Sequence, residues 1–487
     1  MFEMKHYVNR FGFSIAVFAL LVVLCVLNAT ELAFAHAADQ GFVLLLPTDV
    51  YISSGVISVV ISIIFVSVVS KKHLSPIFRP ISFFKIPKFK SVSRTALTVS
   101  SLVSSMVLLT VIAVGMFGSR DPLSNPLPLM IWTVWWIGIF LLQGLFGDIW
   151  RWLNPWSGLY SLVFGRNDEK PILTLPASFE QWPALGIFLL FSVFYLADPA
   201  PSDPHHLAEI VLGYWVFTFV ALIIFGAKTW FLQGEIFTIL FGLISRLSPV
   251  QFSDKLRIGF PGWALISKPE FTLSASFICM ALLGLGSFDG LNETFWWLGV
   301  LGVNPLEFPG KSAIINETIV GLIAANIALM GLFCLCVWLG VLFANRGVAL
   351  EDKVGLKSAV ICFAPALLPI AFGYHFAHFL TSILVSGQYL LIALADPFST
   401  GANYLGLSNF QVTTGFFTDQ DIVRQIWLTQ AGAVVVSHIL AVMLTHIAAA
   451  KLFTGKLKTI IGETPLSLFM IFYTLFGLWL LAAPKGA

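Results

Sequence analysis

The sequence predicts an all-α membrane protein, a polytopic bundle of transmembrane helices. Of its 487 residues, 58% are hydrophobic and 11% are charged, and the mean hydropathy is +0.90. So few charges cannot cover the surface of a water-soluble protein of this size. Apolar runs of about 20 residues, the length that crosses hydrocarbon, recur from end to end. The predicted partner is therefore the lipid bilayer, and a net charge of +2 without a basic patch predicts no nucleic-acid partner.

The first 35 residues are typical of a signal peptide or signal anchor. Lys5 and Arg10 precede an apolar run that ends in "AFA" (33–35), the small-x-small pattern that signal peptidase cleaves. Residues 36–487 are then a single transmembrane helical domain. Cleavage after this pattern makes His36 the first mature residue, and an α-amine beside an imidazole chelates Cu(II) well.

About ten apolar runs after this segment predict membrane spans. Their approximate bounds are 50–70, 95–118, 127–147, 181–198, 207–229, 271–288, 316–345, 357–392, 426–450 and 464–483. The loops on one side are 71–94, 148–180, 228–270, 346–357 and 451–463. These loops hold twenty-one of the 27 lysines and arginines, and the loops on the other side hold four. Because cytoplasmic loops are rich in Lys and Arg, the mature N-terminus and the C-terminus are both expected outside.

Two further apolar stretches are expected to lie along the inner surface of the membrane rather than to cross it. Residues 149–163 place three tryptophans beside Arg151 and Pro155, which suits an interfacial anchor or re-entry. Residues 232–247 are amphipathic and follow a span directly.

Four histidines fall inside two consecutive spans. In "FGYHFAHFLTSILVSGQY" (372–389), His375 and His378 share a helix face. In the next span, His438 and His446 lie two turns apart on the same broad side. Polar groups in hydrocarbon are expensive and usually face the bundle interior or a cavity, so these histidines are candidate functional residues.

Three interpretations of these histidines stay open. Imidazoles that hydrogen-bond between helices explain them without any further role. A metal site is the second interpretation, because imidazole suits Zn and Cu and three neutral histidines leave one coordination position open for water. A heme site or a proton path is the third. The sequence has no HExxH or CxxCH motif that would select one of them.

Carboxylates on the predicted outer side extend this set. Asp396 follows Gln388 beyond the histidine-bearing span, and Asp289 closes another span on the same side. These carboxylates are expected to converge with His36 and His378 on an outward-facing cavity. Each one alone also fits a helix cap.

Four segments together resemble a bacterial membrane-protein family. They are "LFGDIWRWLNPW" (145–156), "SFDGL" (287–291), "AHFLTSILVSGQYLLIALADPF" (377–398) and "SHILAVMLTH" (437–446). In this order they resemble the fenitrothion hydrolase-like polytopic proteins, a membrane-associated organophosphorus hydrolase type, and the resemblance covers most of the chain after the signal. It implies the bacterial inner membrane as the location. The positions that match are His36, Asp148, Asn154, Pro155, Asp289, His378, Gln388, Asp396, Pro397, His438 and His446, whereas His375 has no match.

The resemblance implies hydrolysis of lipophilic organophosphorus triesters, which partition into bilayers. A divalent transition metal, Zn or Cu, held by His36, His378, His438 and His446 would lower the pKa of a bound water to about 7. Alternatively, a histidine acts as a general base without a metal. The catalytic residues expected on this basis are His378, His438 and Asp396, with Asp396 orienting an imidazole.

The alternative function is the handling or transport of copper or another transition metal. His36 on the outside, followed by histidines deeper in the bundle, describes a metal entry route as well as it describes a hydrolase. The small-molecule partner is then a metal ion instead of a lipophilic ester. A scaffold subunit, in which the histidines are dispensable, is a third class.

Overall fold

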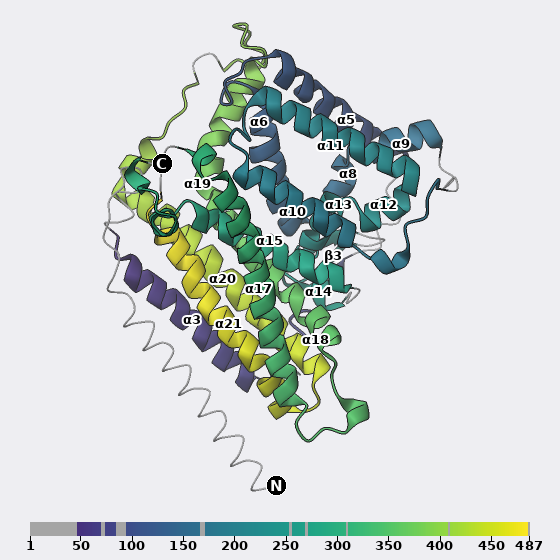
Figure 1. Cartoon of the computed structure of the whole chain (residues 1–487), viewed down its shortest axis with the longest axis vertical. Helices are drawn as coiled ribbons and strands as arrows, with labels where there is room; N and C mark the ends of the chain where they lie inside the picture. The colour runs from purple at the N-terminus through teal and green to yellow at the C-terminus, as the bar shows by residue number, and fades with distance from the viewer. Residues whose placement is uncertain are drawn as a thin grey trace.

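The structure is a computed structural model that describes residues 46–69, 74–83, 94–165, 171–252, 256–267, 271–307, 310–407 and 410–485. It consists almost entirely of helices, as the all-α prediction requires (Figure 1). The predicted signal segment, its cleavage site and His36 lie outside the described residues.

The described residues contain nine helical segments that are long and apolar enough to cross a membrane. They are Thr48–Val68, Thr95–Phe117, Pro126–Phe146, Pro204–Phe225, Leu273–Asn292, Ile315–Ala344, Leu350–Ala395, Gln420–Leu452 and Lys456–Ala482. These correspond to nine of the ten predicted spans. The tenth, expected at 181–198, is the 16-residue helix α10 (Trp182–Ala197). At 1.5 Å per residue it is about 24 Å long, which is shorter than the hydrocarbon core of about 30 Å.

The elements follow one another along the chain as a series of helices with a few short strands and turns. The first half comprises α3 (Thr48–Val68), β1 (Ile81–Phe83), α5 (Arg94–Phe117), α6 (Pro126–Pro128), η2 (Leu129–Ile139), α7 (Phe140–Phe146), α8 (Trp150–Leu153), α9 (Ser157–Phe164), η3 (Ala177–Phe179), α10 (Trp182–Ala197), α11 (Pro204–Phe225), α12 (Ala227–Gln233) and α13 (Ile236–Ser245). The second half comprises β2 (Val250–Phe252), β3 (Leu256–Ile258), α14 (Trp263–Ser267), α15 (Leu273–Asn292), α16 (Phe295–Val300), η4 (Pro305–Glu307), η5 (Lys311–Ala313), α17 (Ile315–Ala344), η6 (Leu350–Asp352), α18 (Leu356–Phe363), η7 (Ala364–Leu367), α19 (Leu368–Ala395), η8 (Gly415–Thr418), α20 (Gln420–Leu452) and α21 (Lys456–Ala482).

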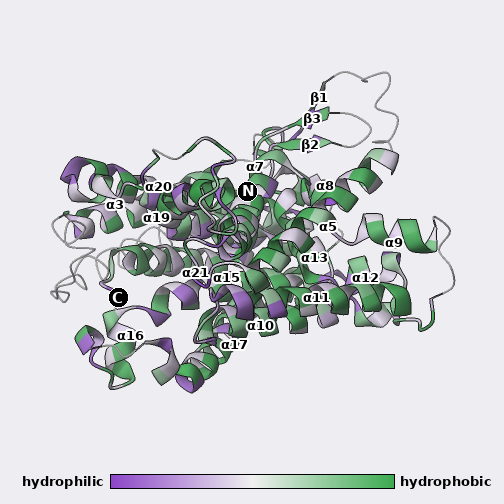
Figure 2. Ribbon diagram, turned by 90° about the horizontal axis from the view of Figure 1, so that it is seen from above, coloured by the Kyte–Doolittle hydropathy of each residue, from purple (hydrophilic) through white to green (hydrophobic). Residues whose placement is uncertain are grey.

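The long helices form one bundle with α15 near its middle. Helices α3, α20, α21 and α17 run side by side, and α5 and α11 run together on the other side of the molecule (Figure 1). Seen from above, α15 and α10 lie between these two groups, and apolar residues predominate in the helices, with scattered polar ones (Figure 2). α15 is the most buried of the nine spans, because 78% of the residues in its apolar stretch are buried inside the protein. A polar side chain on α15 is therefore placed inside the protein and not in lipid.

A small antiparallel sheet, in the order β1–β3–β2, joins two distant loops at one end of the bundle. Ile81 of β1 pairs with Ile258 of β3. At the opposite end, Thr294 pairs with Lys485. Both contacts join loops that the charge pattern assigns to the same side of the membrane, so the grouping of these loops is confirmed. Which side is cytoplasmic stays a prediction.

Two prolines interrupt the long helical segment that carries His375 and His378. Pro365 lies in the 3₁₀ turn η7, and Pro369 lies in the first turn of α19. Proline lacks the N–H that continues an α-helix, so it is tolerated in a first turn and tightens the connection before it. The two prolines thus mark a break between α18 and α19.

The expectation that 232–247 lies along the inner surface is wrong. The helix α13 in this stretch packs inside the protein against α7 and α10, and Ile236, Leu240 and Phe241 are fully buried. Its apolar residues cover both faces, and Glu235 caps its first turn by accepting hydrogen bonds from the amides of Phe237 and Thr238. The stretch 149–163 forms the short helices α8 and α9, with Trp150 and Trp156 buried as well.

Candidate functional site

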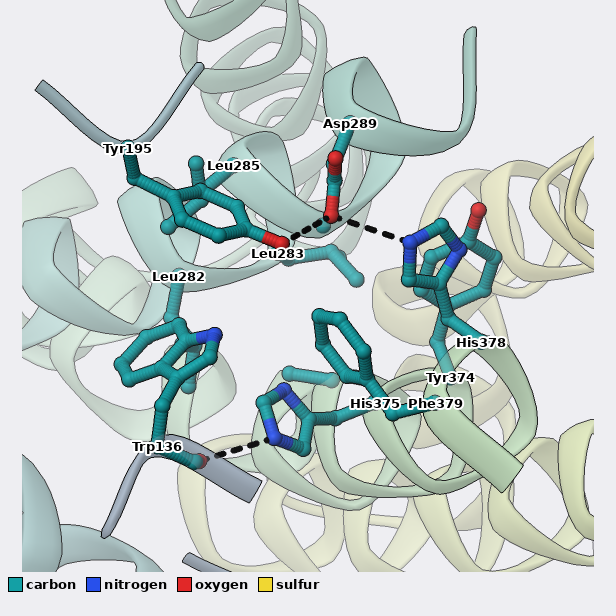
Figure 3. A pocket seen from close by; sticks show the side chains of 12 residues that line it. Trp136, Tyr195, Leu282, Leu283, Leu285, Asp289, Tyr374, His375, His378 and Phe379 are labelled. Carbon is teal, nitrogen blue, oxygen red and sulfur yellow. Dashed lines mark hydrogen bonds and ion pairs between the residues drawn. The ribbon is translucent and has the colours of Figure 1, made fainter. Parts of the chain in front are cut away.

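A small internal cavity of about 20 Å³ lies where η2, α10, α15 and α19 meet. One water molecule needs about 10–15 Å³ of such space. Six polar or aromatic residues of the cavity wall define what we call the His378–Asp289 site (Figure 3): Trp136, Tyr195, Asp289, Tyr374, His375 and His378.

Two glycines of α15 explain how this site is assembled. A Cβ on Gly290 would meet the hydroxyl of Tyr374, and one on Gly286 would come within 3.2 Å of the Tyr374 ring. Tyr374 therefore packs in a groove that only these small residues leave open. His378 follows Tyr374 by one helical turn on the same face of α19, and its ring stacks on the Tyr374 ring at 5.8 Å between centroids. This contact holds the imidazole beside α15.

His378 and Asp289 form a largely buried, hydrogen-bonded pair across the cavity. Nε2 of His378 lies 3.0 Å from Oδ2 of Asp289, and the two side chains are 11% and 9% exposed. The hydroxyl of Tyr195 donates a hydrogen bond of 3.1 Å to the same carboxylate oxygen. Since a carboxylate accepts, Nε2 of His378 carries the proton in this contact, and Nδ1 is the basic nitrogen of the neutral ring. The predicted convergence of Asp289 with His378 is confirmed.

His375 lies on the opposite wall of the same cavity. Its Nε2 donates to the backbone carbonyl of Trp136 at 3.1 Å, and its ring packs 4.1 Å from that of Phe140. Trp136 belongs to η2, an eleven-residue π-helix, a form that is rare and often occurs at functional sites. The structure thus brings both histidines of α19 to one cavity, although only His378 matches the hydrolase-like pattern.

The cavity lies where α19 changes from a covered to a partly exposed helix. His375 and Ala377 are buried, whereas no residue from His378 to Ile392 is buried. His378 is therefore the first residue of a half-open helical stretch.

His438 and His446 lie elsewhere on α20 and do not join this site. Nδ1 of His438 bonds to the carbonyl of Val434 in its own helix at 2.8 Å. Nδ1 of His446 lies 2.8 Å and 3.0 Å from the two carboxylate oxygens of Glu463 on α21. The catalytic role predicted for His438 at the same site as His378 finds no support in this geometry.

Asp396 does not orient an imidazole. It ends α19, and its carboxylate accepts hydrogen bonds from the amides of Thr400 at 2.9 Å and Gly401 at 2.7 Å. These bonds, the one from Thr400 first, lower the pKa of Asp396 below its usual 3.8. Asp396 thus holds the loop that follows α19, just before Pro397. The carboxylate that contacts an imidazole is that of Asp289, although the sequence predicted this role for Asp396. Gln388 likewise bonds the backbone of Thr413 and pins the following loop.

The remaining matched positions organise the opposite end of the bundle. Asp148 accepts a hydrogen bond from the amide of Arg151. Asn154 is buried, bonds Thr238, and lines a second cavity of about 440 Å³. The carbonyls of Asn154 and Pro155 accept hydrogen bonds from serines of α5. These residues tie α8 and α9 to α5 and α13.

The predicted metal ligands are not brought together. Within the part of the chain that the structure describes, no three histidine, cysteine, aspartate or glutamate side chains come close enough to hold a metal ion. His378 and His446 each face a single carboxylate, and His36 lies outside the described residues. The histidines among the described residues therefore do not form a three-histidine metal centre.

Sequence reasoning missed three residues that the structure makes prominent: Tyr195, Trp136 and Glu463. Tyr195 and Trp136 lie in apolar runs that are rich in aromatic residues. Nothing in the sequence distinguishes the Tyr195 hydroxyl or the Trp136 backbone carbonyl from those of the neighbouring residues. Glu463 was assigned to a loop, although it lies within α21 two turns after its start. Its position just before the apolar run "PLSLFMIFYTLFGLWLLA" (465–482) was the available signal.

The comparisons with known proteins add no family assignment. No family model, no curated protein and no solved structure matches this chain. The resemblance to the fenitrothion hydrolase-like proteins therefore stays a prediction, and the chain is described by its own geometry as a multi-pass helical membrane protein with a buried histidine–aspartate pair.

Proposed function

We propose that this protein is a membrane-embedded hydrolase of lipophilic organophosphorus triesters, with His378 as its general base. The observation that carries the proposal is the 3.0 Å contact between His378 and Asp289 on the wall of a cavity that has room for water. An imidazole held by a buried carboxylate is the arrangement by which many hydrolases activate a nucleophile.

The chemistry assigns one role to each group of the pair. Nδ1 of His378 takes a proton from a water molecule, and the water oxygen attacks phosphorus. The bond from phosphorus to the aryloxy oxygen breaks, and nitrophenolate leaves with its electron pair. Asp289 fixes the tautomer of His378 and stabilises the imidazolium that forms, while Tyr195 holds the carboxylate oxygen in place.

The surroundings of the pair suit a neutral, lipid-soluble substrate. The segment from His378 to Ile392 is only partly covered by protein, and the cavity wall between the polar groups is apolar, formed by Leu282, Leu283 and Phe379. A cavity of about 20 Å³ has room for the attacking water but not for the substrate, so the triester is expected to dock against the half-open face of α19.

The test measures nitrophenolate release from a fenitrothion-type thiophosphate triester by the detergent-purified protein. His378→Ala and Asp289→Asn are compared with His205→Ala, which removes a histidine whose side chain is 43% exposed and lies outside the site. We expect the first two variants to lose about 10²–10⁴-fold in rate and the third to match the wild type.

Metal content is measured on the same samples, because metal handling is the competing function. Turnover that is lost in His378→Ala supports the hydrolase. Near-stoichiometric Cu or Zn in a wild-type protein without turnover would overturn it in favour of metal handling. Absence of both turnover and metal would contradict both functions and leave interhelical hydrogen bonding as the role of the histidines.

A further inference from the structure

A second buried acid–base pair lies in the bundle, apart from the His378–Asp289 site. His446 of α20 faces Glu463 of α21 at 2.8 Å, and each side chain is only 6% exposed. Removing ionisable groups from water is costly, so such pairs inside a membrane protein are candidate functional groups. Nothing in the proposed hydrolysis uses this pair.

The two pairs lie near opposite ends of the bundle. Glu463 is two turns from the start of α21, whose first residue Lys456 bonds the carbonyl of Val68 at the end of α3. Asp289 is three residues from the end of α15, close to the Thr294–Lys485 bridge at the opposite end. The pairs therefore stand near the two faces of the membrane.

Polar groups occupy the space between the two pairs. Nε2 of His438 is buried and, within the described residues, has no hydrogen-bond partner. The His438 ring lies 6.5 Å from that of Tyr473, centroid to centroid. The hydroxyl of Tyr473 bonds the hydroxyl of Ser287, and Ser287 precedes Asp289 by two residues on α15.

We propose that these groups form a proton path and that the protein conducts protons across the membrane. The order is Glu463, His446, His438, Tyr473 with Ser287, and then Asp289 with His378. Each hydroxyl or imidazole accepts a proton on one side and releases one on the other, so no oxidant, reductant or further reactant is consumed.

The longest step runs from His446 to His438. The two residues are two turns apart on one helix, about 12 Å at 1.5 Å per residue. A proton that crosses this step needs bridging water molecules, and the unpartnered Nε2 of His438 is the group that would accept a hydrogen bond from them.

The experiment uses the full-length protein in phospholipid vesicles that contain a pH-sensitive dye. A potassium diffusion potential drives protons inward, and the rate of internal acidification is recorded. Wild-type protein is expected to acidify the vesicles faster than protein-free vesicles do. Tyr473→Phe and Glu463→Gln, which each remove one link and keep the side-chain shape, are expected to fall to the protein-free rate.

Two matched controls come from the neighbouring residues. Thr474→Val and Thr464→Val also remove one hydroxyl each from α21, but these hydroxyls bond only carbonyls of their own helix. Both controls are expected to keep the wild-type rate. A wild-type rate equal to that of protein-free vesicles would overturn the proposal, and so would Tyr473→Phe and Glu463→Gln at the wild-type rate. Triester hydrolysis is assayed in detergent without a gradient, so failure of either proposal is seen separately.

Discussion

Asp289 of α15 and His378 of α19 face each other at 3.0 Å inside the bundle, and the Tyr195 hydroxyl of α10 bonds the same carboxylate oxygen. Three helices that are distant along the chain thus contribute one group each. Because the pair is nearly excluded from solvent, its geometry depends on packing and not on local sequence.

Tyr195→Phe is expected to lower the hydrolysis rate without preventing it. The change removes one hydrogen bond to a charged carboxylate, worth about 1.5–3 kcal/mol, so kcat is expected to fall by roughly tenfold to a hundredfold. KM is expected to stay near the wild-type value, because Tyr195 positions Asp289 and does not contact substrate. Steady-state kinetics separate the two constants.

Tyr404→Phe is the control for that change, since Tyr404 is 76% exposed and lies outside the site. Equal kcat values for Tyr195→Phe and the wild type would contradict a positioning role for Tyr195.

Gly290→Ala is expected to abolish hydrolysis in a protein that still inserts into the membrane. The added Cβ would occupy the position of the Tyr374 hydroxyl, so α15 and α19 have to move apart and His378 loses Asp289. Overpacking of this kind costs about 1–3 kcal/mol. Rate and thermal midpoint are measured together.

Gly331→Ala is the matched change on α17, where an added Cβ meets no atom within 4 Å. It is expected to keep wild-type activity, since alanine is a better helix former than glycine. Full activity of Gly290→Ala would show that Tyr374 packing does not hold the pair.

Asp203 is expected to stabilise the protein at neutral pH but not in acid. It caps α11 by accepting from the amide of His206 at 2.9 Å and pairs with Arg120 at 2.8 Å. The His206 amide lowers the pKa of Asp203 below 3.8. A carboxyl whose folded pKa is lowered contributes stability above its unfolded pKa and loses it as pH falls through the folded value.

Asp203→Ala should therefore destabilise the protein at pH 6, by about 1 kcal/mol for a lost helix cap. The difference from the wild type should shrink as the pH falls below 3.8. Thermal midpoints in detergent at several pH values measure it, with Glu209→Ala, whose side chain is 59% exposed, as the control. A difference that is independent of pH would contradict the assignment.

The orientation of the chain is expected to follow its loop charges. In a variant without native cysteines, Leu306→Cys should react with a membrane-impermeant maleimide in intact cells, since Leu306 is 73% exposed in a loop assigned to the outside. Ile258→Cys, in the small sheet, should react only after the membrane is opened. The reverse labelling pattern would invert the topology.

Much of the architecture was predictable because membrane spans are local features. A run of about 20 apolar residues has to become a helix in hydrocarbon, where every backbone group needs an internal partner. The span from 357 to 392 was predicted for this reason. The helix at 236–245 was misplaced, because an apolar helix buried in protein and one at a membrane surface differ in their neighbours and not in their composition.

The candidate site was predictable only in part. The sharing of one face by His375 and His378 follows from helical periodicity, and the membrane depth of Asp289 relative to His378 follows from the alternation of spans. Their contact also needed the Gly286 and Gly290 groove that receives Tyr374, and neither glycine is distinguishable in sequence from the other glycines of the chain.

The amino-acid sequence was enough to predict a multi-pass helical bundle, the loops that share a side, and the four histidines that lie within two of its spans, but not the place of Glu463 inside α21. These properties depend on the composition and the hydrophobic periodicity of each stretch of chain, which are independent of its neighbours in the fold. The polar partners of these side chains depend on the tertiary structure: Asp289 for His378, Glu463 for His446, and the amides of Thr400 and Gly401 for Asp396. A partner is chosen by the rotation and spacing of two packed helices, and side chains from both helices set these together.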